Sequence, residues 1–221
     1  MIAYITGSFI FGLFIPYIAR RFAKFMPSTP ANAIWQTIRI NKFLLPVYYT
    51  KQFKSFMWRS FFSGIVTCGL SYILAYKFGI DGLGWILFYT YTLLLLAEID
   101  WRMYLLPDIL TVPLLIFGFA YSVLGNGWII GADSALGAII GYLLPVLVSF
   151  LLLKKNKDAF GGGDIKLLSA IGAWVGVEPL LYVIAGASIL MLIYSLVRKQ
   201  KAVAFGPALS LSAIAVAIII F

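Results

Sequence analysis

Long apolar runs dominate this chain and restrict it to a helical fold inside a membrane. Crossing the hydrocarbon core of a bilayer takes about 20 mainly apolar residues. Eight stretches approach that length: 2–19, 60–76, 82–99, 109–125, 134–153, 164–177, 179–197 and 203–221. The sequence therefore predicts an all-α polytopic membrane protein with about eight transmembrane helices, in a single integral membrane domain over residues 1–221. The sixth run is short, and its boundary with the seventh rests on Glu178 and Pro179, so seven or six spans are the alternatives.

The basic residues gather on one side when eight spans are threaded through a bilayer. Sixteen of the 17 Lys and Arg residues fall on that side, and the other side keeps only Lys77. By the positive-inside rule the crowded side is cytoplasmic, so both termini are predicted on the outer, periplasmic or extracellular, side. Residues 20–59 then form a basic cytoplasmic loop, which contacts anionic lipid or holds substrate. Aromatic residues such as Tyr104 are expected in the interfacial belts.

The residue types that the chain lacks narrow its chemistry. It is 62% hydrophobic and 11% charged, contains no histidine, and has one cysteine, Cys68, inside an apolar run. These counts exclude an internal disulfide, a Ser-His triad and a cysteine-clustered metal site. The net charge of +9 is explained by the loops of a membrane protein, so no nucleic-acid partner is expected. Chemistry has to come from carboxylates, lysines, tyrosines or hydroxyls.

Two aspartates lie at the same predicted membrane edge. Asp164 follows three glycines, Gly161, Gly162 and Gly163, where the sixth run begins, and Asp100 ends the third run. A carboxylate beside hydrocarbon is costly to keep charged and is by default a functional residue. Threading places both at the cytoplasmic interface, where a helix bundle can bring them together. We therefore predict Asp100 and Asp164 as a catalytic carboxyl pair, supported by the flexible glycines.

Each aspartate also has a structural interpretation. Asp164 after three glycines could be a helix N-cap, and Asp100 could simply end a span and pair with Arg102. Lys166 can snorkel to the interface, where it holds a neighbouring carboxylate ionised or contacts lipid phosphate.

Three further acidic residues are candidates for contact with a substrate. Glu98 lies one turn inside the third run and is expected to neutralise a lysine or arginine of this protein or of its substrate. Asp108 follows Pro107 and competes with Asp100 for the catalytic role, although its position favours a cap on the fourth run. Asp158 lies in a basic stretch and is interpreted as a solvated loop charge close enough to meet substrate.

Two extended motifs resemble those of the type IV prepilin peptidases, membrane aspartyl proteases of the Gly-x-Gly-Asp class. One is Gly161-Gly162-Gly163-Asp164-Ile165-Lys166-Leu167-Leu168, followed by Ile171-Gly172-Ala173-Trp174. The other is Asp100-Trp101-Arg102-Met103-Tyr104-Leu105-Leu106-Pro107-Asp108, followed by Leu110-Thr111 and Pro113-Leu114-Leu115. Weaker similarities are Gly7-Ser8-Phe9 and Phe205-Gly206-Pro207. The resemblance covers residues 95–210 well and the first 90 poorly.

The resemblance implies an aspartic endopeptidase that cleaves the leader of type IV prepilins or pseudopilins at the cytoplasmic face of the bacterial inner (plasma) membrane. It assigns the catalytic role to Asp100 rather than to Asp108, with no cofactor for proteolysis. In many members it also implies methylation of the new N-terminus from S-adenosylmethionine. Many members carry two Cys-x-x-Cys pairs in the first cytoplasmic loop, a pattern associated with zinc. Residues 20–59 contain no cysteine here, so no zinc site is expected, and the loop tied to methylation diverges.

Two other classes of function remain open from the sequence. A transporter or proton channel also uses intramembrane aspartates, although transporters place them near the midplane and show internal repeats. A non-catalytic membrane scaffold would need no paired aspartates. The sequence favours the peptidase, with membrane lipid and a prepilin or pseudopilin as partners, and it gives no indication of oligomeric state.

Overall fold

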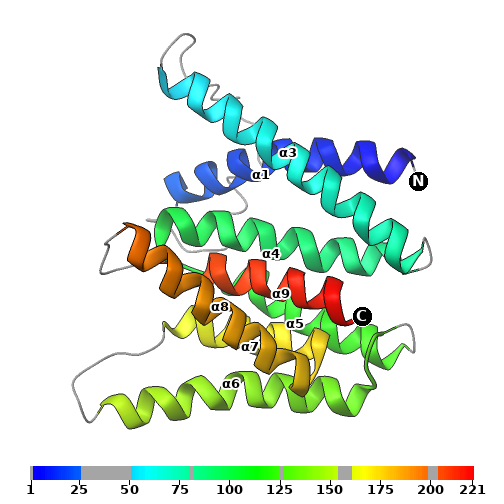
Figure 1. Cartoon of the computed structure of the whole chain (residues 1–221), viewed down its shortest axis with the longest axis vertical. Coiled ribbons are helices and arrows are strands. Elements are labelled where there is room, and N and C mark those ends of the chain that lie inside the picture. The colour runs from blue at the N-terminus through cyan, green and yellow to red at the C-terminus, as the bar shows by residue number, and fades with distance from the viewer. Residues whose placement is uncertain (1, 26–50, 80–81, 125–126, 154–160, 199–203) are drawn as a thin grey trace. The chain divides into compact units, whose positions relative to one another are not determined.

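The structure is a computed structural model that describes residues 2–25, 51–79, 82–124, 127–153, 161–198 and 204–221. Every regular element in these ranges is an α-helix (Figure 1), which confirms the predicted all-helical class. The helices are α1 (Ile2–Phe25), α3 (Lys51–Phe78), α4 (Leu83–Met103), α5 (Asp108–Val123), α6 (Gly131–Leu153), α7 (Gly162–Val175), α8 (Val177–Arg198) and α9 (Gly206–Ile220). Asp158 and most of the basic loop lie outside the described residues.

Five of the described helices are long and apolar enough to cross a membrane, namely α1, α3, α4, α6 and α8. Helices α5 and α9 are shorter apolar helices. With 14 residues, α7 is about 21 Å long at 1.5 Å per residue, less than the ~30 Å of the hydrocarbon core. Each predicted span lies mainly on one helix, and the chain is a multi-pass membrane protein.

Several helix boundaries differ from those predicted. Helix α3 begins at Lys51 rather than at residue 60, and α1 continues through Lys24. A run of apolar residues marks only the part of a helix that lies in the hydrocarbon. The helical hydrogen bonds of the backbone continue beyond it into the polar interface. Helix α7 ends at Val175, before Gly176 with its left-handed φ of 79°, and not at the predicted Glu178-Pro179. Pro179 instead lies in the first turn of α8, where its missing N–H removes no helical hydrogen bond.

The described helices form two compact units, Met1–Tyr91 and Thr92–Phe221. In the first unit α1 and α3 approach closely, because a Cβ on Gly12 would lie 2.8 Å from the Cα of Gly64. The Thr67 hydroxyl donates to the Ser8 carbonyl at 2.9 Å, which joins the two helices. The Tyr91 hydroxyl of α4 also hydrogen-bonds to the Ser8 hydroxyl. Small residues and interhelical hydroxyls of this kind hold helices together in membranes.

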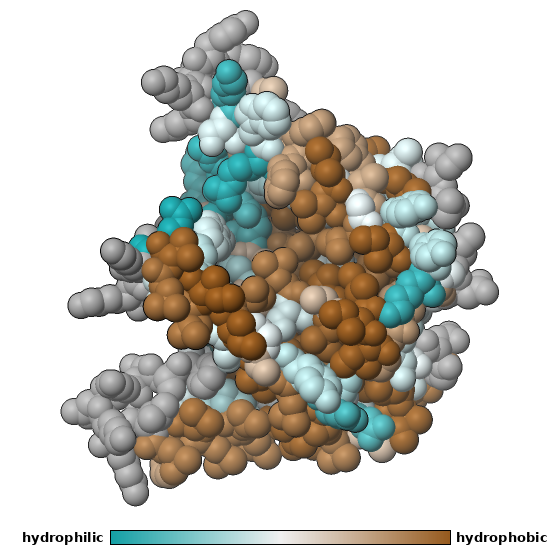
Figure 2. All heavy atoms as spheres, in the orientation of Figure 1, coloured by the Kyte–Doolittle hydropathy of each residue, from teal (hydrophilic) through white to brown (hydrophobic). Residues whose placement is uncertain are grey.

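The second unit is built around α7, whose residues 167–175 are all buried. On one side a Cβ on Gly172 would lie 2.5 Å from the carbonyl carbon of Gly137 on α6, so the two backbones touch. Ser134 and Ser169 add hydrogen bonds across the same contact, to the carbonyls of Ala173 (2.6 Å) and Ala138 (2.9 Å). The other face of α6 carries apolar side chains (Figure 2), among them the exposed Leu136, Ile139, Leu143, Leu147 and Leu151.

Helix α5 holds α7 from another side. The indole N–H of Trp174 donates to the Leu114 carbonyl at 2.7 Å, and Gly118 leaves room for the indole ring. Helices α8 and α9 are joined in turn by the Ser212 hydroxyl, which donates to the Val183 carbonyl at 2.9 Å. Helix α7, which carries Asp164 near its start, is therefore held in place by packing on neighbouring helices.

Candidate active site

Asp100 lies in the last turn of α4 and is held by the start of α9. Its side chain is only 5% exposed, and Oδ2 accepts a hydrogen bond from the Gly206 backbone N–H at 2.9 Å. The first N–H groups of a helix have no partner inside that helix and are available to an acceptor such as this carboxylate. The partner of Asp100 is therefore the Gly206 N–H. The alternative pairing of Asp100 with Arg102 is not formed, because Arg102 binds Glu98 instead.

Asp164 is the third residue of α7 and is half-buried. The N-cap of α7 is Gly161, with no side-chain cap hydrogen bond, so the interpretation of Asp164 as the cap is wrong. A Cβ on Gly163 would lie 2.9 Å from the Cβ of Leu106, and a Cβ on Gly161 would lie 3.3 Å from Oδ2 of Asp164. These two glycines permit close approach, by the segment after α4 and by the carboxylate itself.

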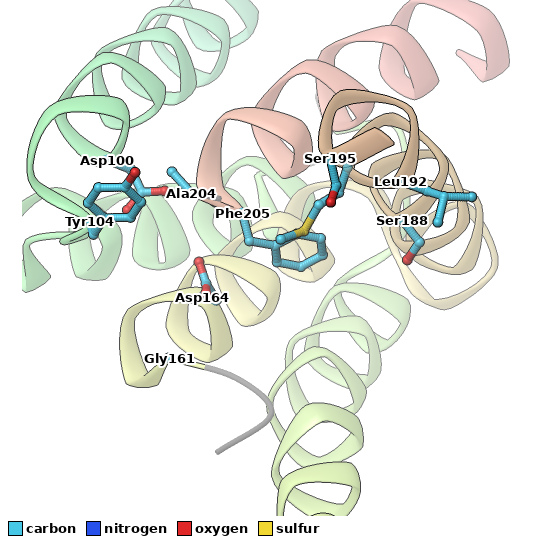
Figure 3. Close-up of a pocket in the computed structure, with 10 residues that line it drawn as sticks. Asp100, Tyr104, Gly161, Asp164, Ser188, Leu192, Ser195, Ala204 and Phe205 are labelled. Carbon is cyan, nitrogen blue, oxygen red and sulfur yellow. The ribbon is translucent and has the colours of Figure 1, made fainter. Parts of the chain in front are cut away.

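Both aspartates line one cavity of about 620 Å³ between α4, α7, α8 and α9 (Figure 3). Its wall consists of Asp100, Tyr104, Gly161, Asp164, Ser188, Met191, Leu192, Ser195, Ala204 and Phe205. A second cavity of about 300 Å³ shares the aspartates and is lined by Asp100, Tyr104, Leu105, Leu106, Asp108, Gly161, Gly162, Gly163 and Asp164. The structure thus brings together the two residues that the sequence singled out, and their catalytic role stays a prediction.

The charged neighbours of the aspartates are paired with one another. Lys166 on α7 contacts both carboxylate oxygens of Asp108 on α5 at 2.7 Å. Arg102 donates from Nε (2.9 Å) and Nη2 (2.7 Å) to one oxygen of Glu98, so Glu98 neutralises an arginine of this protein. Within the described ranges, neither Asp100 nor Asp164 forms an ion pair. The described lysine and arginine side chains nearest the cavity are thus paired with Asp108 and Glu98 rather than with the two cavity aspartates.

Asp108 begins α5 but does not cap it. The N-cap is Pro107, with no side-chain cap hydrogen bond, and the Asp108 carboxylate points instead to Lys166. The predicted capping role is therefore wrong, because Lys166 binds the two carboxylate oxygens of Asp108 that would otherwise accept hydrogen bonds from the first N–H groups of α5. This ion pair ties the start of α5 to the start of α7.

Tyr104 occupies a conformation that is unusual for its residue type. Its φ is 53°, in the left-handed region, directly after the end of α4, and its N–H donates to the Asp100 carbonyl at 2.9 Å. A non-glycine residue there costs about 1–2 kcal/mol. Tyr104 lines both cavities, a position that the interfacial-belt prediction did not anticipate.

Sequence reasoning missed the contributions of α8 and of the start of α9. Ser188, Met191, Leu192 and Ser195 are spaced at three- and four-residue intervals, so they lie on one face of α8. The Phe205-Gly206-Pro207 segment carried a weak signal, since a Gly-Pro pair favours a helix start. Within the described residues, no cluster of three or more His, Cys, Asp or Glu side chains is arranged to hold a metal.

The Lys166–Asp108 pair is expected to contribute modestly to stability. Lys166→Glu places like charges together and should lower the melting temperature by about 2–4 °C, for a loss of about 1 kcal/mol. Exchanging the charges in the Asp108→Lys, Lys166→Glu double variant should restore part of that loss, since lysine in a first helical turn opposes the helix dipole. Thermal unfolding in detergent measures both, with the neutral Lys166→Gln as the control. A double variant less stable than Lys166→Glu would exclude the pairing.

The chain is similar in sequence to a family of membrane peptidases. Residues 87–196, which include both aspartates, match the type IV leader peptidase family. A Dichelobacter nodosus protein named prepilin leader peptidase/N-methyltransferase is 39% identical over 153 residues, which are 67% of this chain and 53% of that relative. Proteins of the same name from Neisseria gonorrhoeae and Escherichia coli K12 are 36% identical over 139 residues (59% of this chain, 48% of the relative) and 38% over 125 residues (53% and 55%). The chain spans about half the length of these curated relatives. No solved structure matches.

Proposed function

Because the chain belongs, through residues 87–196, to the type IV leader peptidase family, we propose that it is a membrane aspartyl endopeptidase. Its substrate is the leader peptide of type IV prepilins or pseudopilins. The observation that carries the proposal is the cavity whose wall contains both Asp100 and Asp164. Relatives named prepilin leader peptidase support the choice of substrate.

The reaction needs one carboxylate and one carboxylic acid on either side of a water molecule. One aspartate accepts a proton from water, and the water oxygen attacks the scissile carbonyl. The other aspartate donates its proton to the departing amine as the peptide C–N bond breaks. A cavity of about 620 Å³ has room for several water molecules, since one water occupies about 30 Å³.

We place the cavity end of the second unit at the cytoplasmic face. Arg102 and Arg198 lie in the last turns of α4 and α8, and Lys166 lies near the start of α7, all at the cavity end. Asp133 and Glu178 lie at the opposite ends of α6 and α8. The positive-inside rule supports this orientation, and with the eight predicted spans it places both termini outside. The bacterial inner membrane is the proposed location. Labelling of engineered cysteines from each side of sealed vesicles tests this topology.

Asp108 and Asp158 are proposed to meet the basic leader of the substrate. Asp108 lines the smaller cavity, and its side chain remains 59% exposed despite its contact with Lys166. An exposed carboxylate with two oxygens can accept a second cation. Asp158 lies outside the described residues. If neutralising both aspartates leaves leader removal unchanged, this contact is excluded.

Methyl transfer is a second activity stated in the names of the relatives. It would use S-adenosylmethionine, which supplies the methyl group when bound, and the described residues include no site that we assign to it. A zinc site does not fit this chain, which has one cysteine and no histidine. The mass of the processed substrate reveals methylation directly, as the addition of one methyl group at its new N-terminus.

Co-expression with a prepilin should yield a shortened product whose new N-terminus is found by mass spectrometry. The same chain in sealed vesicles should carry no proton flux beyond that of empty vesicles. Leader removal without flux supports the peptidase. Flux without leader removal supports a proton channel or transporter. The absence of both leader removal and flux supports a scaffold.

A further inference from the structure

We propose that Gly206 is a positioning residue for the proposed peptidase reaction. Its backbone N–H holds Oδ2 of Asp100, so that Oδ1 is the oxygen that exchanges the proton during catalysis. The role of Gly206 in catalysis rests on the proposed function, in which Asp100 is a catalytic residue. The hydrogen bond that carries it is a separate observation, and Gly206 lies beyond the residues matched to the family.

The contact is specific in geometry and in placement. The donor and acceptor are 2.9 Å apart and buried, and they join residues 106 positions apart in sequence. Asp100 is 5% exposed, so bulk water competes little for Oδ2. Ala204 and Phe205, which precede the donor, line the same cavity as Asp100 and Asp164 (Figure 3). The start of α9 is therefore part of the wall around the carboxyl pair.

Glycine is required at this position by the space available. A Cβ at residue 206 would lie 2.7 Å from Oδ2, 3.0 Å from Cγ and 3.1 Å from Cβ of Asp100. The carboxylate cannot yield freely, because it is buried and attached to the last turn of α4. Pro207 follows and has no N–H, so the donor aimed at Asp100 is supplied by Gly206.

A fixed donor decides which carboxyl oxygen carries the proton. A backbone N–H can only donate, and the hydroxyl oxygen of a protonated carboxyl group accepts a hydrogen bond more weakly than its carbonyl oxygen does. Oδ2 therefore acts as the acceptor in both protonation states of Asp100. The proton occupies Oδ1 when Asp100 is the acid, and Oδ1 is the free acceptor when Asp100 is the base. The peptide backbone of α9 thus orients the proton transfer.

A steric variant tests the positioning role. Gly206→Ala in the full chain, assayed in vesicles with a prepilin, should lower kcat by about 10- to 100-fold, as expected for losing a hydrogen bond to a charged group. KM should stay within about twofold, because substrate binding elsewhere is retained. One limb of the pH–rate profile should also move. The matched control is Gly186→Ala, whose Cβ would lie 2.5 Å from the Ser212 hydroxyl in the α8–α9 contact, away from Asp100.

A second variant removes the donor without adding bulk. Incorporating glycolic acid at position 206 replaces the N–H by an ester oxygen, and the matched control is the ester at Leu209, whose N–H donates to Phe205 at 3.0 Å within the helix. Infrared spectra should show the carboxylic C=O band of Asp100, identified by its loss in Asp100→Asn, at higher wavenumber in the 206 ester. The Leu209 ester should leave that band in place.

The two readouts separate this inference from the proposed function. Wild-type kcat in both Gly206 variants, or an unmoved infrared band, overturns the positioning role. An equal loss of kcat in Gly186→Ala and Gly206→Ala, with neither limb of the pH profile moved, makes the role structural and also overturns it. If the wild-type chain removes no leader while the band moves, the proposed function fails and the hydrogen bond to Asp100 stands.

Discussion

Replacing either Asp100 or Asp164 by asparagine is expected to lower leader removal by at least about 100-fold, the smaller end of what a general acid or base contributes. Asparagine has nearly the same shape as aspartate but can neither accept nor donate the required proton, so the cavity around it should persist. The two losses should not add in the double variant, because either one already breaks the pair. The measurement is the rate of prepilin shortening at matched amounts of enzyme in the membrane.

The control for this experiment is Asp133→Asn, which changes an exposed carboxylate in the first turn of α6. It should leave the rate unchanged. The wild-type rate should also fall on both sides of a pH optimum, since one member of the pair must be ionised and the other protonated. Leader removal at the wild-type rate in Asp100→Asn or Asp164→Asn, or a pH profile with one limb only, would exclude the pair as the catalytic apparatus.

The helices and the pairing of the two aspartates could be anticipated from the sequence because both follow from one-dimensional patterns. Hydropathy alone separates membrane helices from loops, since unpaired backbone groups are excluded from hydrocarbon. Asp100 and Asp164 each lie at the edge of an apolar run, on the side where the basic residues gather. A bundle can bring together two residues at its same end, and Asp100 and Asp164 do share one cavity.

The partners of these residues could not be anticipated, because they depend on which helices are neighbours. The sequence predicts a neighbouring carboxylate or a lipid phosphate as the partner of Lys166, and nothing in it selects Asp108. The Gly206 N–H reaches Asp100 only because α9 begins beside the end of α4. In a membrane such adjacency is decided by close contacts between small residues, and the sequence does not state which small residues face each other.

The contact between Gly172 of α7 and Gly137 of α6 is one of these, and a side chain added there is expected to have a large effect. Gly172→Ala is expected to destabilise the protein by about 3 kcal/mol, the upper end of the usual range for overpacking, because the new Cβ would meet backbone rather than a side chain that can rotate away. That Cβ would lie 2.5 Å from the carbonyl carbon of Gly137, and residues on both sides of Gly172 are buried. The melting temperature in detergent should fall by about 6–12 °C.

The matched control is Gly84→Ala in α4, where a Cβ would meet no atom within 4 Å. There the better helix propensity of alanine should leave stability unchanged or raise it by up to about 1 kcal/mol. Leader removal by Gly172→Ala should fall together with the folded fraction, because α7 carries Asp164 and the contact of α7 with α6 is part of the fold. A Gly172→Ala protein as stable as Gly84→Ala would mean that α6 and α7 do not touch through these glycines. The position of Asp164 would then have to be set by the other contacts of α7, such as that of Trp174 with α5 and that of Lys166 with Asp108.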